Sequence, residues 1–402
     1  MGTKTTCSLP LMVIWQRAIK KIPKHGDGSS RGCVLRCGGH PLCRGKAFQA
    51  VTQGWITADW QPFTDRVRCL KSWIYITEAG ARLGLTGGRY VISRENEVLA
   101  EIPSEIVEGV TVIDSVQLSS RAIVDFLKRE IPVTWLSTEG KFFGRLESTA
   151  VQDITRIKEQ FQRQEEAEFS TELTRLTVFR KVYNQRAILR NYNRRADNAQ
   201  VKKAYEDIRI LADKIHGART VDEIMGYEGA IARIYFQALN AFLPEDFRFE
   251  KRTKRPPKDC FNSMLSFGYT LLMYDFYSAI SRARLNPYIG FCHALKDKHP
   301  ALASDLMEPW RAAVVASFCL ALVTHREIDA SYFMRSEEND GVYLNRVGRR
   351  IFIQAYERKM RSVNSYFDGK YSWRHTVQME CDSYRQAVHE GDPKLVKALV
   401  IR

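Results

Sequence analysis

The feature that most constrains the fold is the length of the helical signal in the second half of the chain. From about residue 153 to residue 360, apolar side chains recur at helical spacing, and Gly217 is a natural helix stop. Within this region, residues 312–323 are strongly apolar but too short to span a bilayer, which indicates a buried helix. The sequence therefore predicts a large all-α domain over residues 151–362.

The segment before this domain has a different sequence pattern. Residues 71–150 contain short runs of β-branched and aromatic residues, such as Trp73-Ile-Tyr-Ile76 and Val110-Thr-Val-Ile113, separated by glycine turns. The segment contains no pairing of a nucleophile with a base, so we interpret it as a packing or dimerisation module. The predicted class is α+β, with a small β-rich N-terminal domain followed by a larger all-α domain.

The two ends of the chain give weaker signals. Residues 1–70 contain eleven Lys and Arg against three Asp and show no sustained periodicity, so we expect a basic extension there. Within it, Cys33, Cys37 and Cys43 have the spacing C-x3-C-x5-C, which fits a metal site only if another Cys or His supplies a fourth ligand. Residues 363–402 are predicted to form a polar tail.

The charge of the chain narrows the choice of partner. Its 402 residues carry a formal net charge of +15, which favours nucleic acid or an anionic membrane as the partner. No convincing signal peptide is present, and we expect no membrane role. The chain has 9 Cys, an odd number that is typical of reduced thiols, so we expect a cytoplasmic protein.

Basic residues recur in two places within the helical region. A loop at residues 251–257 combines four cations with a Pro-Pro pair, and it predicts contacts to a DNA backbone through Lys251, Arg252, Lys254 and Arg255. The predicted helix near residues 165–191 also carries cations, which either contact phosphate or form a solvated face. These are Arg175, Arg180, Lys181, Arg186 and Arg190.

Four polar residues are candidates for a catalytic centre. Glu228 lies in a helical pattern, His293 follows Gly290 in a loop, and Asp305 and Glu308 are three residues apart. If their segment is helical, the last two carboxylates share a face. Carboxylates with one imidazole can bind a hard divalent cation, with Mg²⁺ or Mn²⁺ as the expected ion. The competing interpretation is an exposed Glu, a structural His and a helix cap.

Several motifs now occur together in one order along residues 71–360. They are Tyr-Glu228-Gly, Arg-Pro-Pro-Lys-Asp259 through Asn262, Ser266-Phe-Gly-Tyr269, Asn286-Pro-Tyr-Ile-Gly-Phe-Cys-His293, Asp305-Leu-Met-Glu308-Pro-Trp-Arg311 and Leu344-Asn-Arg-Val-Gly-Arg-Arg350. With these motifs the chain resembles the CRISPR-associated spacer-acquisition integrases. Residues 1–70 match nothing in the family pattern.

The resemblance implies a function and a set of site residues. It implies that Glu228, His293 and Glu308 bind a divalent metal, with Asp305 close to the site. It also implies an enzyme that inserts spacer DNA into a CRISPR array, by attack of a DNA 3′-hydroxyl on a repeat phosphodiester. Arg311 is one helical turn from Glu308 and can hold phosphate or pair with an acid.

The same resemblance implies partners. We expect double-stranded DNA, a homodimer joined through the β-rich domain, and a small ferredoxin-like CRISPR adaptation protein. Two other hypotheses remain open at this stage. One is a catalytically silent DNA-binding scaffold, and the other is a nuclease of branched DNA that does not integrate.

Overall fold

The computed structural model divides the chain into two compact units, residues 1–45 and 46–402. In the first unit it describes only a hairpin of β1 (Arg36–Cys37) and β2 (His40–Pro41). In the second unit it describes residues 72–95, 97–149, 153–367 and 369–401. The hypothesis of a metal site at Cys33, Cys37 and Cys43 lies outside the residues whose side chains are described.

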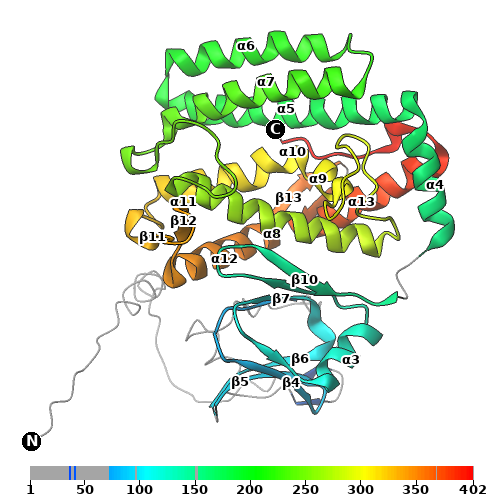
Figure 1. The fold of residues 1–402 in the computed structure, drawn as a ribbon, viewed down its shortest axis with the longest axis vertical. Helices are drawn as coiled ribbons and strands as arrows, with labels where there is room; N and C mark the ends of the chain where they lie inside the picture. The colour runs from blue at the N-terminus through cyan, green and yellow to red at the C-terminus, as the bar shows by residue number, and fades with distance from the viewer. Residues whose placement is uncertain are drawn as a thin grey trace, which may run out of the picture. The chain divides into compact units, whose positions relative to one another are not determined.

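Residues 72–146 form a β-rich domain of two four-stranded sheets, seen at the bottom of Figure 1. One sheet has the order β10-β9-β7-β3, and the other has the order β6-β5-β4-β8. The strands of the first sheet are β3 (Ser72–Ile76), β7 (Val107–Ile113), β9 (Val133–Leu136) and β10 (Phe142–Leu146). Those of the second are β4 (Arg82–Thr86), β5 (Arg89–Arg94), β6 (Glu97–Pro103) and β8 (Gln117–Leu118), and α3 (Ser120–Lys128) completes the domain.

Strand β3 joins this domain to the helices, because both of its faces are buried. Side chains alternate between the two faces of a strand. Ile74 and Ile76 therefore pack into the core of the β-rich domain, whereas Trp73 and Tyr75 pack into the core of the helical domain. An ion pair of 2.5 Å between Arg346 and the buried Glu78 adds a second connection between the two domains. The two domains thus share a continuous packed boundary.

The helical domain is built on one long helix, α5 (Ala167–Ala196). It packs against α6 (Ala199–Ile215) and α7 (Val221–Leu239) in the upper part of Figure 1. The predicted order of a β-rich N-terminal domain and a larger helical domain is confirmed. The other main helices are α4 (Ile154–Glu165), α8 (Cys260–Arg282) and α12 (Arg346–Arg361). A small hairpin of β11 (Phe333–Arg335) and β12 (Val342–Leu344) precedes α12.

The apolar run at residues 312–323 is buried, as the sequence predicts, but it is not one regular helix. Consecutive short helices cover residues 301–324, and 83% of their most apolar window lies inside the domain. Pro309 at the start of the second helix separates it from the first, because proline is tolerated only in a first helical turn. The segments are α9 (Ala301–Leu306), α10 (Glu308–Trp310), the π-helical η5 (Arg311–Ala316) and α11 (Ser317–Thr324).

The prediction of a polar tail over residues 363–402 is wrong for the part that the structure describes. This part forms a hairpin of β13 (Val363–Tyr366) and β14 (Gly369–Ser372), then α13 (Trp373–Glu390) and the 3-10 turn η7 (Pro393–Leu395). Helix α13 buries one apolar stripe that includes Trp373, Val377 and Tyr384. The prediction failed because it was based on the polar composition of this segment, and composition does not show that the apolar residues share one face of a helix.

Candidate active site

Two carboxylates and an ammonium from three different helices meet in the interior of the helical domain. Glu228 lies in the middle of α7, Glu308 begins α10, and Lys181 lies on the buried face of α5. The Lys181 Nζ donates to Glu228 Oε1 and, at 2.5 Å, to Glu308 Oε2. The side chains of Lys181 and Glu308 are each 8% exposed, and that of Glu228 is 16% exposed. The two predicted carboxylates therefore converge on one point.

His293 reaches the same place from the loop between α8 and α9. Its Nε2 lies 3.8 Å from Glu308 Oε1, and its Nδ1 lies 2.6 Å from Asp305 Oδ1. The contact with Asp305 assigns the proton to Nδ1, which leaves Nε2 as the nitrogen that faces Glu308. Burial by itself lowers the pKa of His293, but the hydrogen bond and charge of Asp305, helped by Glu308, outweigh it and raise the pKa.

Asp305 holds the loop that carries His293. Its buried carboxylate accepts the backbone N–H groups of Phe291 at 2.6 Å and of Cys292 and His293 at 3.0 Å each. A Cβ at Gly290 would lie 2.7 Å from the Ala301 Cβ and 2.8 Å from Asp305 Oδ2. The backbone at Gly290 therefore approaches α9 too closely for a side chain to fit. Asp305 acts here through the loop and the imidazole, because its two oxygens are already engaged.

Buried polar residues outside the predicted set anchor the site. The Gln160 Nε2 on α4 donates to the Asn286 and Ile289 carbonyls at 2.9 and 2.7 Å, which fixes the start of the His293 loop. The Asn184 Nδ2, one turn beyond Lys181, donates at 2.7 Å to the Pro309 carbonyl. Sequence reasoning missed these anchors, since a buried amide looks like any exposed Gln or Asn until its partners are known.

The charges of the cluster are balanced within it. Burial raises the pKa of the Glu308 carboxyl, but Arg311, Lys181 and His293 together bring it down to about 2, so this group is ionised. Burial lowers the pKa of Lys181, and the charges of Glu308 and Glu228 reverse this and raise it. Glu308 and Lys181 thus form an ion pair inside the domain rather than a neutral hydrogen bond.

Some of the predicted DNA-binding residues are bonded inside the fold, and the others are exposed to solvent. Arg252 is one of those bonded inside the fold. Its guanidinium donates to the Thr253 carbonyl, to Asn262 Oδ1 at 2.8 Å and to Ser266 Oγ at 3.1 Å. These bonds tie the basic loop to the start of α8. Arg252 therefore shapes the loop, and most of its donors are already used.

Arg311 also faces inward. Its Nε lies 3.0 Å from Glu308 Oε1, and its guanidinium carbon lies 4.9 Å from the centre of the Tyr269 ring. The remaining predicted DNA-binding residues are exposed, and they are Lys251, Lys254 and Arg255.

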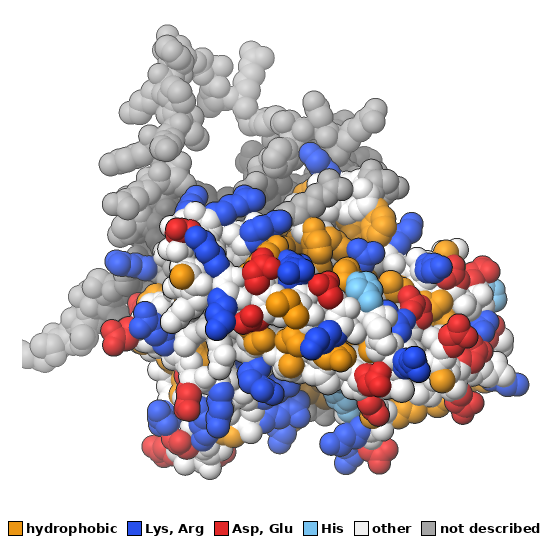
Figure 2. Space-filling view, turned by 90° about the horizontal axis from the view of Figure 1, so that it is seen from above, with side chains coloured by type: hydrophobic (Ala, Val, Ile, Leu, Met, Phe, Trp, Pro, Cys, Tyr) orange, Lys and Arg blue, Asp and Glu red, His pale blue; other side chains and the backbone are white. Residues whose placement is uncertain are grey.

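The basic residues of α5 are also divided. Lys181 is buried at the carboxylates, Arg175 donates to the Ala218 carbonyl at 2.7 Å, and the Arg186 guanidinium carbon lies 4.2 Å from the centre of the Tyr205 ring. These three are used inside the fold. Exposed cations gather instead around the turn between α5 and α6, and they are Arg190, Arg194, Arg195, Lys202 and Lys203. Figure 2, which looks down on α6, shows Lys and Arg spread over this side with Asp and Glu among them.

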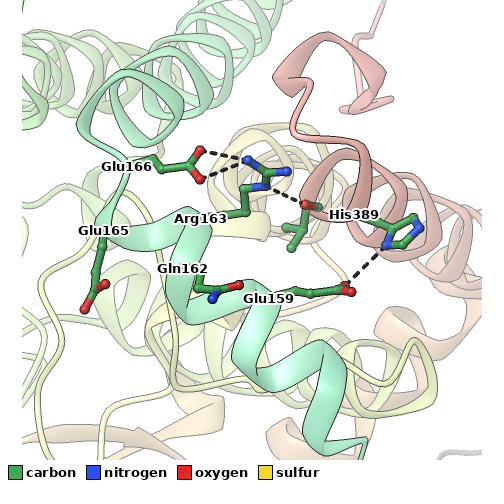
Figure 3. A pocket seen from close by; sticks show the side chains of 7 residues that line it. Glu159, Gln162, Arg163, Glu165, Glu166 and His389 are labelled. Carbon is green, nitrogen blue, oxygen red and sulfur yellow. Dashed lines mark hydrogen bonds and ion pairs between the residues drawn. The ribbon is translucent and has the colours of Figure 1, made fainter.

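A surface hollow of about 570 Å³ lies elsewhere, between α4 and α13. Figure 3 shows Arg163 beside Glu166 and His389 facing Glu159. The Arg163 Nε also donates to the Val388 carbonyl, and the His389 Nδ1 lies 3.3 Å from Glu159 Oε2. None of the predicted site residues lines this hollow.

The donors at the convergence suit a hard divalent cation. Two carboxylates and one imidazole nitrogen are the ligand types that Mn²⁺ accepts, and Mg²⁺ prefers the carboxylates. A positive group, the Lys181 ammonium, already lies between Glu228 and Glu308, so this place attracts positive charge. With Lys181 in this position, no group of three or more His, Cys, Asp or Glu side chains in the described part of the chain is arranged to hold a metal ion.

Comparisons with known proteins agree with this arrangement of motifs. Residues 74–358 match the model of the family described as "CRISPR associated protein Cas1". A CRISPR-associated endonuclease Cas1 from Mycobacterium tuberculosis is 30% identical over 323 residues, which are 80% of this chain and 95% of that protein.

Two solved structures are similar in fold. A Cas1 protein from Thermotoga maritima superposes with a TM-score of 0.69 at 25% identity, over 82% of this chain and 99% of that chain. A casposase bound to integration product gives a TM-score of 0.71 at 21% identity, over 83% of this chain and 96% of that chain.

Proposed function

Because the chain belongs to the Cas1 family of CRISPR-associated proteins, we propose that it is a metal-dependent DNA endonuclease and integrase of CRISPR adaptation. The proposed reaction is attack of a DNA 3′-hydroxyl on a phosphodiester of the CRISPR repeat, which inserts a new spacer. Attack by water at the same centre cuts DNA instead. The M. tuberculosis relative is named an endonuclease, and a protein of the same fold is bound to an integration product, which supports both reactions.

The observation that carries the proposal is the convergence of Glu228, Glu308 and His293. They come from α7, from α10 and from a loop that Asp305 holds in place, and they are far apart in sequence. A merely structural histidine needs no second acidic group beside its other ring nitrogen. Here Nε2 faces Glu308, whose other oxygen is bridged by Lys181 to Glu228. This arrangement favours a shared cation over three independent structural roles.

The chemistry that we assign to the cofactor, Mg²⁺ or Mn²⁺, is neutralisation of charge at the reacting phosphate and the leaving oxygen. Glu228 and Glu308 would hold the ion through carboxylate oxygens, and His293 would hold it through Nε2. In the neutral imidazole, the hydrogen bond to Asp305 places the proton on Nδ1, which would leave Nε2 free to hold the ion. The side chains of Lys251, Lys254 and Arg255 would bind the DNA backbone, which positions the duplex without reading its sequence.

We extend the proposal to partners. Double-stranded DNA is the substrate class that fits a net charge of +15. A homodimer through the β-rich domain is supported by β10, which ends its sheet and exposes Phe143. We also propose a small ferredoxin-like CRISPR adaptation protein as partner and a cytoplasmic location. Light scattering of the purified protein, alone and with that partner, tests the assembly.

The test of the function measures joining and cutting on one substrate. Labelled duplex DNA with free 3′-hydroxyl ends is incubated with a plasmid that carries a CRISPR repeat, in the presence of Mn²⁺ or of a chelator. We expect joined product only with the metal. We also expect Glu228→Gln, Glu308→Gln and His293→Ala to lose joining, whereas Glu206→Gln, in a surface ion pair with Arg209, keeps it.

The same assay separates the two alternative functions. A catalytically silent scaffold retards DNA in a gel but gives no joined or cut product under any condition. A nuclease that does not integrate cuts branched DNA with the metal but gives no joined product. Either pattern in the wild-type protein would overturn the proposed integrase activity.

A further inference from the structure

Lys181 belongs to the buried cluster, but the proposed mechanism does not use it. It projects from the buried face of α5 together with Val178 and Val182, and all three side chains are buried. A lysine buried in this way cannot reach DNA outside the domain. Its ammonium instead makes hydrogen bonds to both Glu228 and Glu308.

One oxygen of each carboxylate is therefore already engaged by the ammonium. Glu228 Oε1 and Glu308 Oε2 accept from the Lys181 ammonium, and Glu308 Oε1 lies 3.0 Å from the Arg311 Nε. A divalent cation that entered between the carboxylates would stand within a few ångströms of the ammonium. Like charges at such short distances repel strongly in a buried site. The ammonium and the metal ion cannot both keep the same oxygens.

We propose that Lys181 is a built-in counter-ion of the metal site, which holds Glu228 and Glu308 together before the ion binds and releases at least one of them when it binds. This inference rests on the proposed metal site. Lys181 is then a positioning residue rather than a catalytic one. It stabilises two buried carboxylates that would otherwise repel each other, and it weakens the affinity for the ion.

The surroundings show which part of the chain can move. Asn184, on the next turn of α5, donates to the Pro309 carbonyl and to the Leu399 carbonyl, so the backbones of α5 and α10 are fixed to each other. The lysine stem, in contrast, has four methylene groups with rotatable bonds. The ammonium can therefore leave one carboxylate by rotation of its own side chain, while α5 and α10 stay in place.

The experiment measures Mn²⁺ binding by isothermal titration calorimetry to protein freed of metal with a chelator. We compare the wild type with Lys181→Met and Lys181→Gln, which remove the charge but keep an unbranched side chain. The control is Lys202→Met, which removes an exposed cation that pairs with Asp197. We expect the two Lys181 variants to bind Mn²⁺ about tenfold more tightly than wild type and control, because a competing charge is gone.

Each other outcome has a definite meaning. Wild-type or weaker Mn²⁺ affinity in both Lys181 variants overturns the counter-ion role but leaves the proposed metal site intact. No Mn²⁺ binding by any of the proteins overturns the metal site, and this inference with it. If the variants unfold without metal, circular dichroism during Mn²⁺ addition decides the matter. Recovery of the helical signal supports the proposal, and failure to recover it in both variants contradicts it.

Discussion

The Nδ1 of His293 lies 2.6 Å from Oδ1 of Asp305, and the same carboxylate accepts three consecutive backbone N–H groups. One buried side chain thereby sets both the path of the loop and the orientation of the imidazole. Asp305 is three residues from Glu308, which the imidazole faces from its other side. The two carboxylates of this short segment thus have different tasks, since Asp305 bonds to the loop and the imidazole, whereas Glu308 is bridged to Glu228 by Lys181.

Replacing Asp305 with asparagine tests this division of tasks. An amide offers one acceptor atom where the carboxylate offers two, so at least one buried donor in the loop loses its partner. We expect the free energy of unfolding to fall by about 2 kcal/mol or more, and the joining rate to fall roughly 10- to 100-fold, as is typical for a residue that orients a metal ligand. Chemical denaturation and the joining assay measure the two effects. Unchanged stability and activity in the Asp305→Asn variant contradict this role.

Substitution of Gly290 tests how closely the loop packs. A Cβ at this position meets Ala301 and Asp305 at less than 3 Å, so Gly290→Ala is expected to destabilise the protein by about 1–3 kcal/mol. The matched control is Gly229→Ala on α7, beside Glu228, where an added Cβ meets nothing within 4 Å. Alanine in an open helical position raises stability by up to ~1 kcal/mol. A lower melting temperature for Gly290→Ala and a higher one for Gly229→Ala would confirm the prediction. Equal shifts in the two variants would contradict it.

The buried carboxyl of Glu380 leads us to predict that the free energy of unfolding depends on pH. Its buried carboxyl accepts from Trp310 Nε1 at 2.7 Å and from the Leu399 N–H at 3.1 Å. Burial nevertheless raises the pKa of Glu380 to about 8. The folded protein therefore holds a proton that the unfolded chain releases near the ordinary glutamate pKa of 4.5. Between these two pKa values, stability falls as pH rises, because the native state binds more protons than the unfolded state.

We expect the variant Glu380→Gln not to lose stability as the pH rises, because an amide does not ionise and still accepts hydrogen bonds. We expect the difference in melting temperature between the variant and the wild type to shift in favour of the variant as the pH rises from about 5 to about 8.5. Glu390→Gln, at the exposed end of the same helix, is the control. Parallel curves for wild type and Glu380→Gln across this range would contradict the assignment.

The basic loop gives a prediction about DNA binding. Lys251→Ala and Arg255→Ala remove exposed cations, and each is expected to weaken binding on all sequences and to reduce the salt slope by about 1. Arg252→Ala is expected mainly to lower the melting temperature, because its guanidinium is bonded to Asn262 and Ser266. Fluorescence anisotropy at several salt concentrations and thermal unfolding separate the two effects. An Arg252→Ala protein that melts normally but fails to bind DNA reverses this assignment.

Local signals in the sequence predict much of the fold because their chemistry is local. Thr220 caps α7 by accepting from the N–H of Glu223, and Asp259 caps α8 by accepting from the N–H of Asn262. Gly290 is required by close contacts with Ala301 and Asp305, which follow it by 11 and 15 positions in the chain. Features of this kind depend on few neighbours, so a short stretch of sequence is enough to identify them.

The errors concern residues whose role depends on distant partners. Lys181 resembles its neighbours in a basic helix, and only the spacing of Val178 and Val182 shows that it faces inward. The two carboxylates that pair with the buried ammonium, those of Glu228 and Glu308, lie 47 and 127 positions away in the sequence. The prediction of a polar tail fails for a related reason. The buried Glu380 adds to the polar composition of α13 although it bonds to Trp310 inside the domain.

The central claim is that Glu228, His293 and Glu308 bind one divalent cation. The most direct test is anomalous diffraction from a crystal soaked in Mn²⁺. We predict one strong anomalous peak within coordination distance of a Glu228 oxygen, a Glu308 oxygen and the His293 Nε2, with the Lys181 ammonium withdrawn from at least one carboxylate. A fully soaked crystal with no peak there, and with Lys181 still bridging both carboxylates, would contradict the account.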